Sequence, residues 1–294
     1  MMKKIKTIII GLGNIGLKYD LNSNKKIILT HVKAATFSKN FNLVATIDKK
    51  NKIKKIFEKK YKIKSYKNLN EYLAINQNKK IDLVIISSPN TQHLKNVKES
   101  LIKLKPKIIF CEKPFGNNLS DAKKIKKYCQ KKKCKIFVNY TRLTDLQTKI
   151  ISNKIKNHEN IADVLYSKNI IINGSHFINL FLRLFGKLIS LNKKKDKIIL
   201  KFKKGTVNLK KTSNSLKANT YQINNKDYKI LVSRNLFKIY SRKKLIISKK
   251  IDKKNNYYVF KEIEKSFFNK KNKLCKVNEA IETQKIIKKI NMLK

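Results

Sequence analysis

The sequence of this 294-residue chain contains no tryptophan, three prolines and seven glycines, while lysine, asparagine and isoleucine are abundant throughout. This combination of scarce and abundant residues indicates a general compositional bias more than a surface selected for one partner. No segment approaches the roughly 20 consecutive apolar residues that a membrane-spanning helix needs. The opening MMKKIKTIIIGLG has the basic-then-apolar order of a secretory signal, but its apolar run is short, is broken by glycines and lacks a small-residue cleavage site. We therefore expect a soluble, cytoplasmic protein that opens on a β-strand.

Cysteine is also sparse, and its spacing excludes the common metal motifs. None of the four cysteines, Cys111, Cys129, Cys134 and Cys275, stands in a C-x-x-C pair. Cys129 and Cys134 lie in a lysine-rich stretch without histidine ligands nearby. We expect free, mostly structural thiols and no metal site.

Acidic residues are few, 18 against 72 lysines and arginines, which gives a formal net charge of +54. Such a balance raises the possibility of a nucleic-acid or anionic-surface partner. However, only four of the basic residues are arginines, whose forked guanidinium suits bases and phosphates. The lysines are spread along nearly every segment. We interpret them as a solvated coat and expect neither a specific nucleic-acid partner nor a membrane partner.

The first half of the chain alternates short apolar runs with helical patterns, which is typical of βαβ units and a parallel sheet. The predicted strands are Thr7–Ile10, Asn42–Asp48, Ile81–Ser87, Lys107–Cys111 and Lys135–Asn139. The predicted helices are Thr30–Ser38, Lys52–Lys60, Asn70–Gln77, Thr91–Leu104 and Ser120–Lys132. This order predicts a doubly wound Rossmann domain over residues 1–140.

The second half has a different pattern, in which alternating strands follow one another without intervening helices. The predicted strands are Ala162–Ser167, Lys197–Phe202, Thr206–Lys210, Ala218–Ile223, Tyr228–Val232, Leu236–Tyr240 and Leu245–Ile247. The predicted helices are Leu146–Asn157, Phe177–Phe185, Tyr257–Phe268 and Val277–Ile290. We expect a C-terminal α+β domain over residues 141–294, with a mostly antiparallel open sheet. The chain as a whole is predicted to be of the α/β class.

A glycine motif follows the first predicted strand, with Gly11, Gly13 and Gly16 spaced as G-x-G-x-x-G. Glycines permit the tight turn and a close approach of the backbone to a pyrophosphate, which backbone N–H groups can receive. Asp48 ends the second strand, where an acid can accept hydrogen bonds from the adenosine ribose of NAD. Its distance from Gly16 exceeds the standard interval of about 20 residues, which predicts an extra loop at residues 20–29. Lys49 and Lys50 could instead accommodate the 2′-phosphate of NADP.

Two further segments follow predicted parallel strands, whose carboxyl ends face the cofactor crevice in this fold. They are Ser87-Ser88-Pro89-Asn90 and Cys111-Glu112-Lys113-Pro114. Lys113 is a candidate to orient and polarise a substrate oxygen. His176, near the start of an apolar helix, is the best acid–base candidate because an imidazole titrates near neutral pH, although a capping or core histidine is an equal alternative on pattern alone.

Seven segments occur in order along nearly the whole chain: GLGNIG, NLVATID, SSPNTQH, CEKPF, VNYTR, NGSHFINLFLRLFG and NEAIETQKIIKKI. In this order they resemble the Gfo/Idh/MocA family of NAD(P)-dependent oxidoreductases. The E-K-P and G-S-H-x-I-x-L-x-x-x-L-F-G elements are much more specific than the glycine loop. Similar proteins join a Rossmann domain to a C-terminal α/β domain, whose open antiparallel sheet often serves oligomerisation. The resemblance therefore implies a homo-oligomer formed through the C-terminal sheet.

The resemblance also assigns roles to residues. It implies a cofactor site made of Gly11, Gly13, Asn14, Ile15, Gly16, Asp48, Ser87, Ser88, Pro89, Asn90, His93, Glu112 and Lys113. It implies substrate contacts from Tyr140, Arg142, Asn173 and Asn179. In similar proteins the E-K-P lysine, here Lys113, lies beside the nicotinamide and often precedes a cis-proline bond, while the helix-opening histidine, here His176, commonly exchanges the proton. Lys113 and His176 are thus the catalytic candidates.

The chain departs from the family at the acids around the histidine. Many members have aspartate four positions before it, where this chain has Ile172 followed by Asn173, and the most similar subgroup has aspartate three positions after it, where this chain has Asn179. The leading hypothesis is a hydride transfer between NAD, or alternatively NADP, and a ring carbon of a sugar or nucleotide-linked sugar, in surface-polysaccharide biosynthesis. The alternative is a catalytically weakened dinucleotide- and sugar-binding protein of the same fold.

Overall fold

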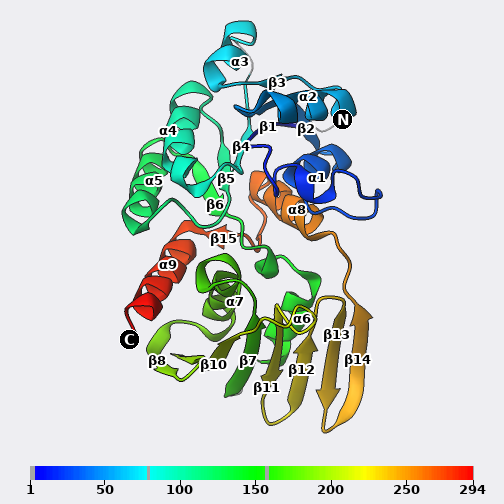
Figure 1. The fold of residues 1–294 in the computed structure, drawn as a ribbon, viewed down its shortest axis with the longest axis vertical. Helices are drawn as coiled ribbons and strands as arrows, with labels where there is room; N and C mark the ends of the chain where they lie inside the picture. Colours follow the sequence, from blue (N-terminus) through cyan, green and yellow to red (C-terminus); the bar gives the residue numbers. More distant parts are fainter. Residues whose placement is uncertain (1–3, 78–79, 156–158, 294) are drawn as a thin grey trace. The chain divides into compact units, whose positions relative to one another are not determined.

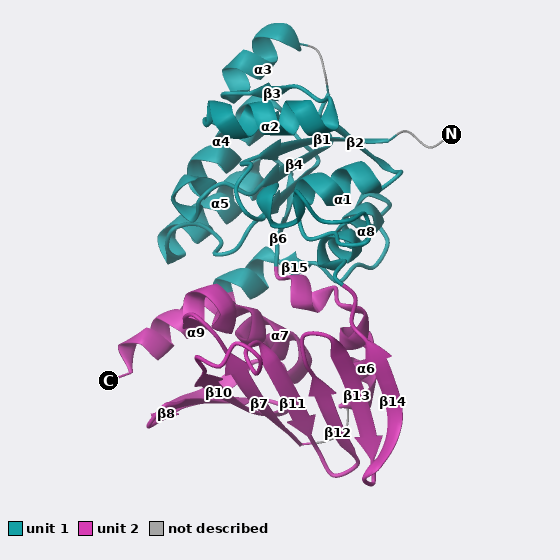
Figure 2. Cartoon of the chain, turned by 45° about the vertical axis from the view of Figure 1, so that its right-hand side comes forward, with its two compact units in different colours: residues 1–139, 253–281 teal, residues 140–252, 282–294 magenta. Residues whose placement is uncertain are grey.

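The computed structural model describes residues 4–77, 80–155 and 159–293, and its chain divides into two compact units (Figure 2). Unit 1 comprises residues 1–139 and 253–281. Unit 2 comprises residues 140–252 and 282–294. Each unit contains one sheet, and the units are described separately below.

Unit 1 is built on a seven-stranded sheet in the order β15-β6-β5-β4-β1-β2-β3 (Figure 1). All neighbouring strands are parallel except β15, which pairs antiparallel with β6. Strands β4 and β5 consist of apolar residues that are all buried, as expected for strands covered on both faces. The strands are β1 (Ile5–Ile10), β2 (Phe41–Ile47), β3 (Ser65–Tyr66), β4 (Leu83–Ile86), β5 (Ile108–Cys111), β6 (Lys135–Val138) and β15 (Cys275–Lys276). This confirms the predicted Rossmann-type parallel sheet.

Helices accompany the strands as the βαβ pattern predicts. Three of them begin at side-chain caps, because Thr30, Asn68 and Asn118 each accept a hydrogen bond from the backbone N–H three residues later. The helices are α1 (His31–Phe37), α2 (Asn51–Tyr61), α3 (Leu69–Ile75), α4 (His93–Lys103), α5 (Leu119–Lys131) and α8 (Asn255–Phe267). Figure 1 shows α4 and α5 together beside the strands, and α1 next to α8.

Helix α8 returns to unit 1 from far along the sequence. Its Val259, Phe260 and Ile263 are fully buried in the same apolar core as Ile9 of β1 and Phe41 of β2. The sequence expectation divided the chain once, near residue 140, whereas contacts assign residues 253–281 to the first unit. The reason is packing: the face of α8 completes a core that residues 1–139 leave open.

Unit 2 is built on an eight-stranded sheet in the order β14-β13-β12-β11-β7-β10-β9-β8. Neighbouring strands in this sheet are antiparallel except for the parallel pair β7 and β10, which confirms the predicted, mostly antiparallel sheet. Phe177 and Phe181 of α7 pack edge-on against Tyr221 of β11, so this helix covers one face. The strands are β7 (Asn160–Tyr166), β8 (Leu188–Lys194), β9 (Lys197–Phe202), β10 (Gly205–Lys211), β11 (Thr220–Asn224), β12 (Tyr228–Val232), β13 (Leu236–Ser241) and β14 (Lys244–Lys250).

The remaining helices are α6 (Leu146–Lys154), α7 (Ser175–Phe185) and α9 (Val277–Met292). Only the residues of α9 are divided between the two units. A π-helical turn, Ile170–Gly174, leads directly into α7. The helix predicted for Leu146–Asn157 ends earlier, and its predicted residues 156–157 lie outside the described part of the chain.

Three strands were not predicted. Strands β3 and β15 have only two residues each, too few for a periodic pattern, and β8 is a largely exposed edge strand that ends in Asn192, Lys193 and Lys194. All four cysteines are buried and none forms a disulfide. Over residues 4–77, 80–155 and 159–293, no helix combines the length and apolar character that crossing a membrane requires.

Candidate functional site

The glycine loop between β1 and α1 shows which glycines serve the fold and which leave space. Gly11 has φ +101°, and a Cβ there would lie 2.5 Å from the backbone nitrogen of Ser88. A Cβ on Gly16 would lie 2.2 Å from the carbonyl oxygen of Gly11. By contrast, apart from Gly13 itself and its two chain neighbours, no atom of the described residues lies within 4 Å of the Cβ position at Gly13. Gly11 and Gly16 therefore allow close backbone packing, and Gly13 faces open space.

A cavity of about 620 Å³ opens at this loop, entirely within unit 1. Six of the predicted cofactor residues line it: Gly11, Gly13, Asp48, Ser87, Ser88 and Pro89. Six lysines also line it: Lys18, Lys49, Lys50, Lys67, Lys95 and Lys103. Asn14, Ile15, Gly16, Asn90, His93, Glu112 and Lys113 are not among its lining residues. The cavity thus joins the carboxyl ends of β1, β2 and β4, as expected for a Rossmann crevice.

Asp48 follows β2 directly and reaches the glycine loop. Its Oδ2 accepts a 2.7 Å hydrogen bond from the backbone N–H of Leu12, and its Oδ1 accepts one of 2.9 Å from the N–H of Lys50. Each carboxylate oxygen has a second lone pair, so these bonds leave capacity for two ribose hydroxyls. Asp48 therefore joins the glycine loop to the end of β2 on the wall of the cavity.

The extra loop predicted at residues 20–29 is present between a short turn and α1. Asp20 is buried, and its carboxylate accepts hydrogen bonds from the N–H of Leu29 (2.6 Å), the N–H of Thr30 (2.9 Å) and the Thr30 hydroxyl (2.6 Å). The ammonium of Lys33 contacts the carbonyl oxygen of Asn24 at 2.7 Å. The loop is thus anchored at both ends by polar contacts.

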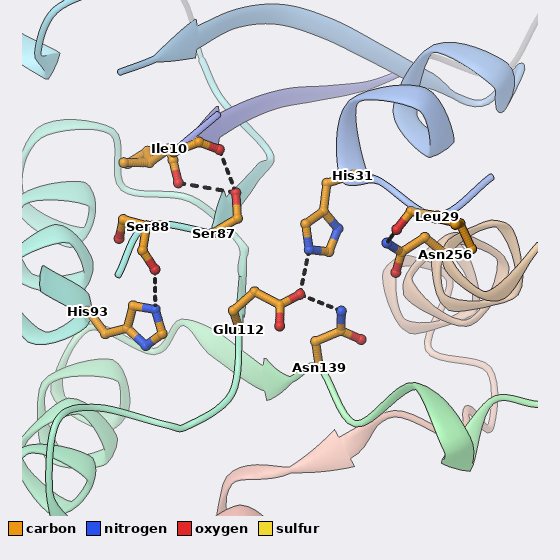
Figure 3. A network of polar contacts seen from close by, with 10 residues as sticks. Ile10, Leu29, His31, Ser87, Ser88, His93, Glu112, Asn139 and Asn256 are labelled. Atoms are coloured by element: carbon orange, nitrogen blue, oxygen red, sulfur yellow. Dashed lines mark hydrogen bonds and ion pairs between the residues drawn. The ribbon is translucent and has the colours of Figure 1, made fainter. Parts of the chain in front are cut away.

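Glu112, which precedes Lys113, is buried in a polar network that is visible in Figure 3. Its Oε1 lies 2.7 Å from Nε2 of His31 and accepts a 2.6 Å hydrogen bond from the side-chain amide of Asn139. Burial by itself would raise the pKa of the Glu112 carboxyl. The hydrogen bond and the charge interaction with His31, the hydrogen bond from Asn139 and the charge of Lys113 outweigh it and hold the pKa below its ordinary value.

The same contact determines which ring nitrogen of His31 donates to the carboxylate. An ionised carboxylate only accepts, so Nε2 of His31 carries the hydrogen. The ring is fully buried, with Phe110 edge-on at 6.0 Å, and its Nδ1 has no hydrogen-bond partner among the described residues.

His93, the first residue of α4, lies on the other side of Lys113. Its Nε2 is 2.9 Å from the carbonyl oxygen of Ser88 and its Nδ1 is 3.1 Å from that of Pro114 (Figure 3 shows the Ser88 contact). The peptide bond between Lys113 and Pro114 is cis. Burial lowers the pKa of His93, against the opposing effects of the two carbonyl contacts and of Glu112.

In unit 2, His176 is the second residue of α7, directly after the π-helical turn. Such turns often occur at functional sites. The ring of Tyr140 lies edge-on to the ring of His176, with centroids 5.7 Å apart. Tyr140 is itself buried. The structure therefore brings a predicted catalytic residue and a predicted substrate residue into contact.

Arg142 is held inside unit 2 by contacts with its own chain. Its guanidinium lies 4.1 Å from the centroid of the Phe177 ring and donates a 3.2 Å hydrogen bond to the carbonyl oxygen of Asn219. Burial lowers its pKa, while the charges of Asp145 and Tyr221 oppose that change. These contacts give Arg142 a packing role beside any role with a substrate.

Asn173 and Asn179 also have partners within unit 2. The side-chain amide of Asn173 donates to the hydroxyl of Ser167 at 2.9 Å, and that of Asn179 donates to the hydroxyl of Thr283 at 3.0 Å. Asn219 donates to the same Ser167 hydroxyl at 3.1 Å, so Arg142 and Asn173 are connected through Asn219 and Ser167. Asn179 is buried and ties α7 to α9.

Sequence reasoning missed the partners of these residues. His31 lies 81 positions from Glu112, and Leu12 lies 36 positions from Asp48. The one available signal was a glutamate directly after a buried strand, because a buried carboxylate requires polar partners. Nothing in the local sequence identifies those partners.

Comparison with protein families finds a match for the first part of the chain. Residues 5–140 match a family model described as the oxidoreductase family with an NAD-binding Rossmann fold, GFO_IDH_MocA. No curated protein sequence matches the chain.

Solved structures share the fold over nearly the full length. A dehydrogenase from Clostridium difficile has a TM-score of 0.79 at 18% identity, with 98% of this chain and 99% of that chain covered. An oxidoreductase from Agrobacterium radiobacter in complex with NAD+, L-tartaric acid and magnesium has a TM-score of 0.74 at 14% identity, with 97% and 95% covered. A 3-ketoreductase from Actinomadura kijaniata in complex with TDP-benzene and NADP has a TM-score of 0.73 at 11% identity, with 97% and 96% covered.

Proposed function

On the premise that residues 5–140 belong to the NAD-binding Rossmann domain of the Gfo/Idh/MocA oxidoreductase family, we propose that this protein transfers a hydride to or from a ring carbon of a sugar or nucleotide-linked sugar. We further propose that the reaction serves surface-polysaccharide biosynthesis. The observation that carries the proposal is the 620 Å³ cavity of unit 1, in which Gly13 leaves space and Asp48 offers a carboxylate. The 3-ketoreductase with a similar fold, solved in complex with TDP-benzene and NADP, supports the nucleotide-sugar class.

The residues of the cavity suit a dinucleotide. Gly13 would let the pyrophosphate approach the backbone, and Asp48 would accept hydrogen bonds from the adenosine ribose. Ser87, whose hydroxyl donates to the carbonyl oxygen of Gly11 at 2.7 Å, would keep the loop after β4 closed against the glycine loop. When bound, NAD(P) supplies the site that accepts or donates the hydride.

The proposed chemistry assigns one role each to Lys113 and His176. In the oxidation direction, a neutral His176 accepts the proton of the substrate hydroxyl. Lys113 orients the same oxygen and stabilises the negative charge that develops on it. In the reduction direction His176 returns the proton. We propose that Tyr140, Arg142, Asn173 and Asn179 surround the substrate in this arrangement.

The test is a panel of free sugars, polyols and nucleotide-linked sugars, offered to the full chain with NAD+ or NADP+ while reduced-nicotinamide absorbance is followed. On any substrate that reacts, Lys113→Ala and His176→Ala should each lower turnover by roughly 10² or more. Their dinucleotide affinity, measured by calorimetry, should stay close to wild type, because neither lines the cavity. Near-full turnover by His176→Ala would overturn its role.

For the cofactor we propose a preference for NAD(H) over NADP(H). The carboxylate of Asp48 would repel a 2′-phosphate but would bond a free hydroxyl. The lysines of the cavity, Lys49 and Lys50 above all, act in the opposite sense. Calorimetry with both dinucleotides at one fixed salt concentration decides between them, and tighter NADP(H) binding contradicts the preference.

A second function is favoured by one specific feature: Ile172 and Asn179 stand at positions where similar proteins carry aspartate. A binding protein of this fold would hold the dinucleotide tightly and turn over none of the panel. Asn179→Asp distinguishes the two, because a carboxylate near His176 should raise turnover in an enzyme that lacks a relay. Tight cofactor binding without turnover, both in the wild type and in Asn179→Asp, supports the binding protein.

We also propose that the chain forms a homo-oligomer through the face of the unit 2 sheet that α7 leaves uncovered. This face carries exposed apolar side chains, including Ile161 at 51% and Leu236 at 38% exposure. Light scattering should show an oligomer for the wild type and a smaller species for the double variant Ile161→Lys and Leu236→Lys. A wild-type monomer at micromolar concentration would contradict the proposal.

A further inference from the structure

Lys113 lies between two residues that buried side chains of unit 1 hold in place. Glu112 on one side is held by His31 at 2.7 Å and by Asn139 at 2.6 Å. Pro114 on the other side has its carbonyl oxygen 3.1 Å from Nδ1 of His93. The backbone that carries Lys113 is therefore fixed from both directions by groups that do not themselves line the cavity.

His93 connects this backbone to the wall of the cavity. Its other nitrogen, Nε2, lies 2.9 Å from the carbonyl oxygen of Ser88, and Ser88 lines the cavity. From the same helix, Asn96 donates a 2.8 Å hydrogen bond to the Ser88 hydroxyl. Helix α4 thus holds Ser88 at two atoms, and one ring joins Ser88 to Pro114.

The position of the His93 ring argues against direct contact with a cofactor. The residue is 1% exposed, and each of its ring nitrogens is within hydrogen-bond distance of a backbone carbonyl oxygen. A carbonyl only accepts, so a neutral ring donates to one of the two at a time and a protonated ring donates to both. Either form keeps at least one of the two segments bound to α4.

We propose that His93 is a positioning residue: by bonding the carbonyl oxygens of Ser88 and Pro114 it holds Lys113 at a fixed place relative to the cavity. The proposal rests on the function given above for Lys113. Without the ring, the carbonyl groups of Ser88 and Pro114 lose the donor that they share, and a void remains between the segments. The Lys113 segment then samples a wider range of positions, and a displacement of about 1 Å near reacting groups can lower a rate by about 10².

The test measures the mobility of position 113 in the full chain without substrate or cofactor. In a Lys113→Cys background, a nitroxide spin label is attached and its spectrum recorded. The label is selective because the native cysteines are at most 7% exposed, and burial raises the pKa of the Cys134 thiol to about 12. Adding His93→Ala should shift the spectrum toward a mobile component. His93→Gln, which keeps an amide donor, should restore part of the immobile component.

The matched control is Leu101→Ala in the same background. Leu101 is buried in the same helix, eight residues further on, and its truncation destabilises the protein by a cavity without touching Ser88 or Pro114. Its spectrum should stay like that of the parent. An unchanged spectrum for His93→Ala, or equal mobility in both variants, overturns the proposal.

Turnover provides the second measurement and separates the two proposals. With Lys113 restored, His93→Ala should lower turnover by up to about 10²-fold, whereas Leu101→Ala should not beyond its loss of folded protein. If the wild type turns over no member of the panel, the proposed function fails, and the spin-label spectra still decide whether His93 positions residue 113.

Discussion

At the scale of single residues, Gly11 and Gly13 lie in opposite surroundings although they are two positions apart. Gly11 adopts a left-handed conformation and packs against the backbone of Ser88, while Gly13 faces open space in the cavity. A methyl group at the first position meets the protein, and one at the second meets whatever occupies the cavity. A substitution at Gly11 should therefore change stability, whereas a substitution at Gly13 should change binding.

We expect Gly13→Ala to leave the free energy of unfolding within about 0.5 kcal/mol of wild type, apart from the small propensity change of a loop residue. Its affinity for NAD(H) should fall by roughly tenfold or more, which is about 1.4 kcal/mol. Gly11→Ala should instead destabilise the fold by about 1–3 kcal/mol through strain and overlap. Urea unfolding and calorimetry measure the two effects. Unchanged NAD(H) affinity in Gly13→Ala would contradict the assignment of the cavity.

The lowered pKa of Glu112 predicts how the stability of the fold depends on pH. Its pKa is lower in the folded protein than in the unfolded chain, so the ionised carboxylate stabilises the fold above the ordinary glutamate pKa of 4.5. That stabilisation is lost as pH falls through the lowered value, because the folded protein must then take up the proton. Glu112→Gln should cost about 1–3 kcal/mol at neutral pH, the scale of a hydrogen bond to a charged group.

Urea unfolding of both proteins across the acid range checks this. The difference between wild type and Glu112→Gln should shrink toward low pH. Glu282→Gln is the control, because its partner Lys285 is at 3.0 Å on the surface, where ion pairs contribute little. A difference that stays constant down to the acid transition contradicts an ionised Glu112.

At the scale of elements, the scarcity of glycine leaves lysine at helix ends that normally use glycine. The residue that caps the end of helix α2 is Lys62, whose φ is 55° and ψ 31°. Lys105, just after α4, and Lys133, just after α5, also have positive φ. A side chain in this left-handed conformation costs roughly 1–2 kcal/mol relative to the ordinary helical one, and glycine avoids most of that cost.

The same substitution should therefore have opposite signs at two positions of one helix. Lys62→Gly at the end of α2 should stabilise the protein by about 0.5–1 kcal/mol. Lys55→Gly in the middle of the helix should destabilise it by about 1 kcal/mol, because glycine is a poor helix former. Both lysines are exposed, so differences in packing are small. Thermal or urea unfolding measures the pair, and two changes of the same sign would refute the explanation.

At the scale of the whole molecule, the formal net charge is +54, because 18 acidic residues neutralise only a small part of the charge of 72 basic ones. The lysines occur on helices, strands and loops of both units and are not confined to the six that line the cavity. Such a surface attracts polyanions through counterion release but has few arginines to read bases.

We expect nucleic-acid binding to be measurable only at low salt, to be independent of sequence and to collapse by physiological ionic strength. Fluorescence anisotropy with two unrelated duplexes over a salt series measures this. A sequence-selective complex that survives at physiological salt would show that the basic surface is a specific site.

The sequence alone determined the local elements and the order of the motifs. The periodicity of the strands and helices is written in neighbouring residues, and the glycines, Asp48 and the E-K-P segment each follow a predicted strand, so the Rossmann sheet and the wall of the cavity could be predicted. Only the tertiary structure decided that α8 completes the core of unit 1, that His31 and Asn139 hold Glu112, and that His93 joins Ser88 to Pro114. These contacts link residues that are distant in the chain, and no pattern among near neighbours encodes which buried polar group meets which.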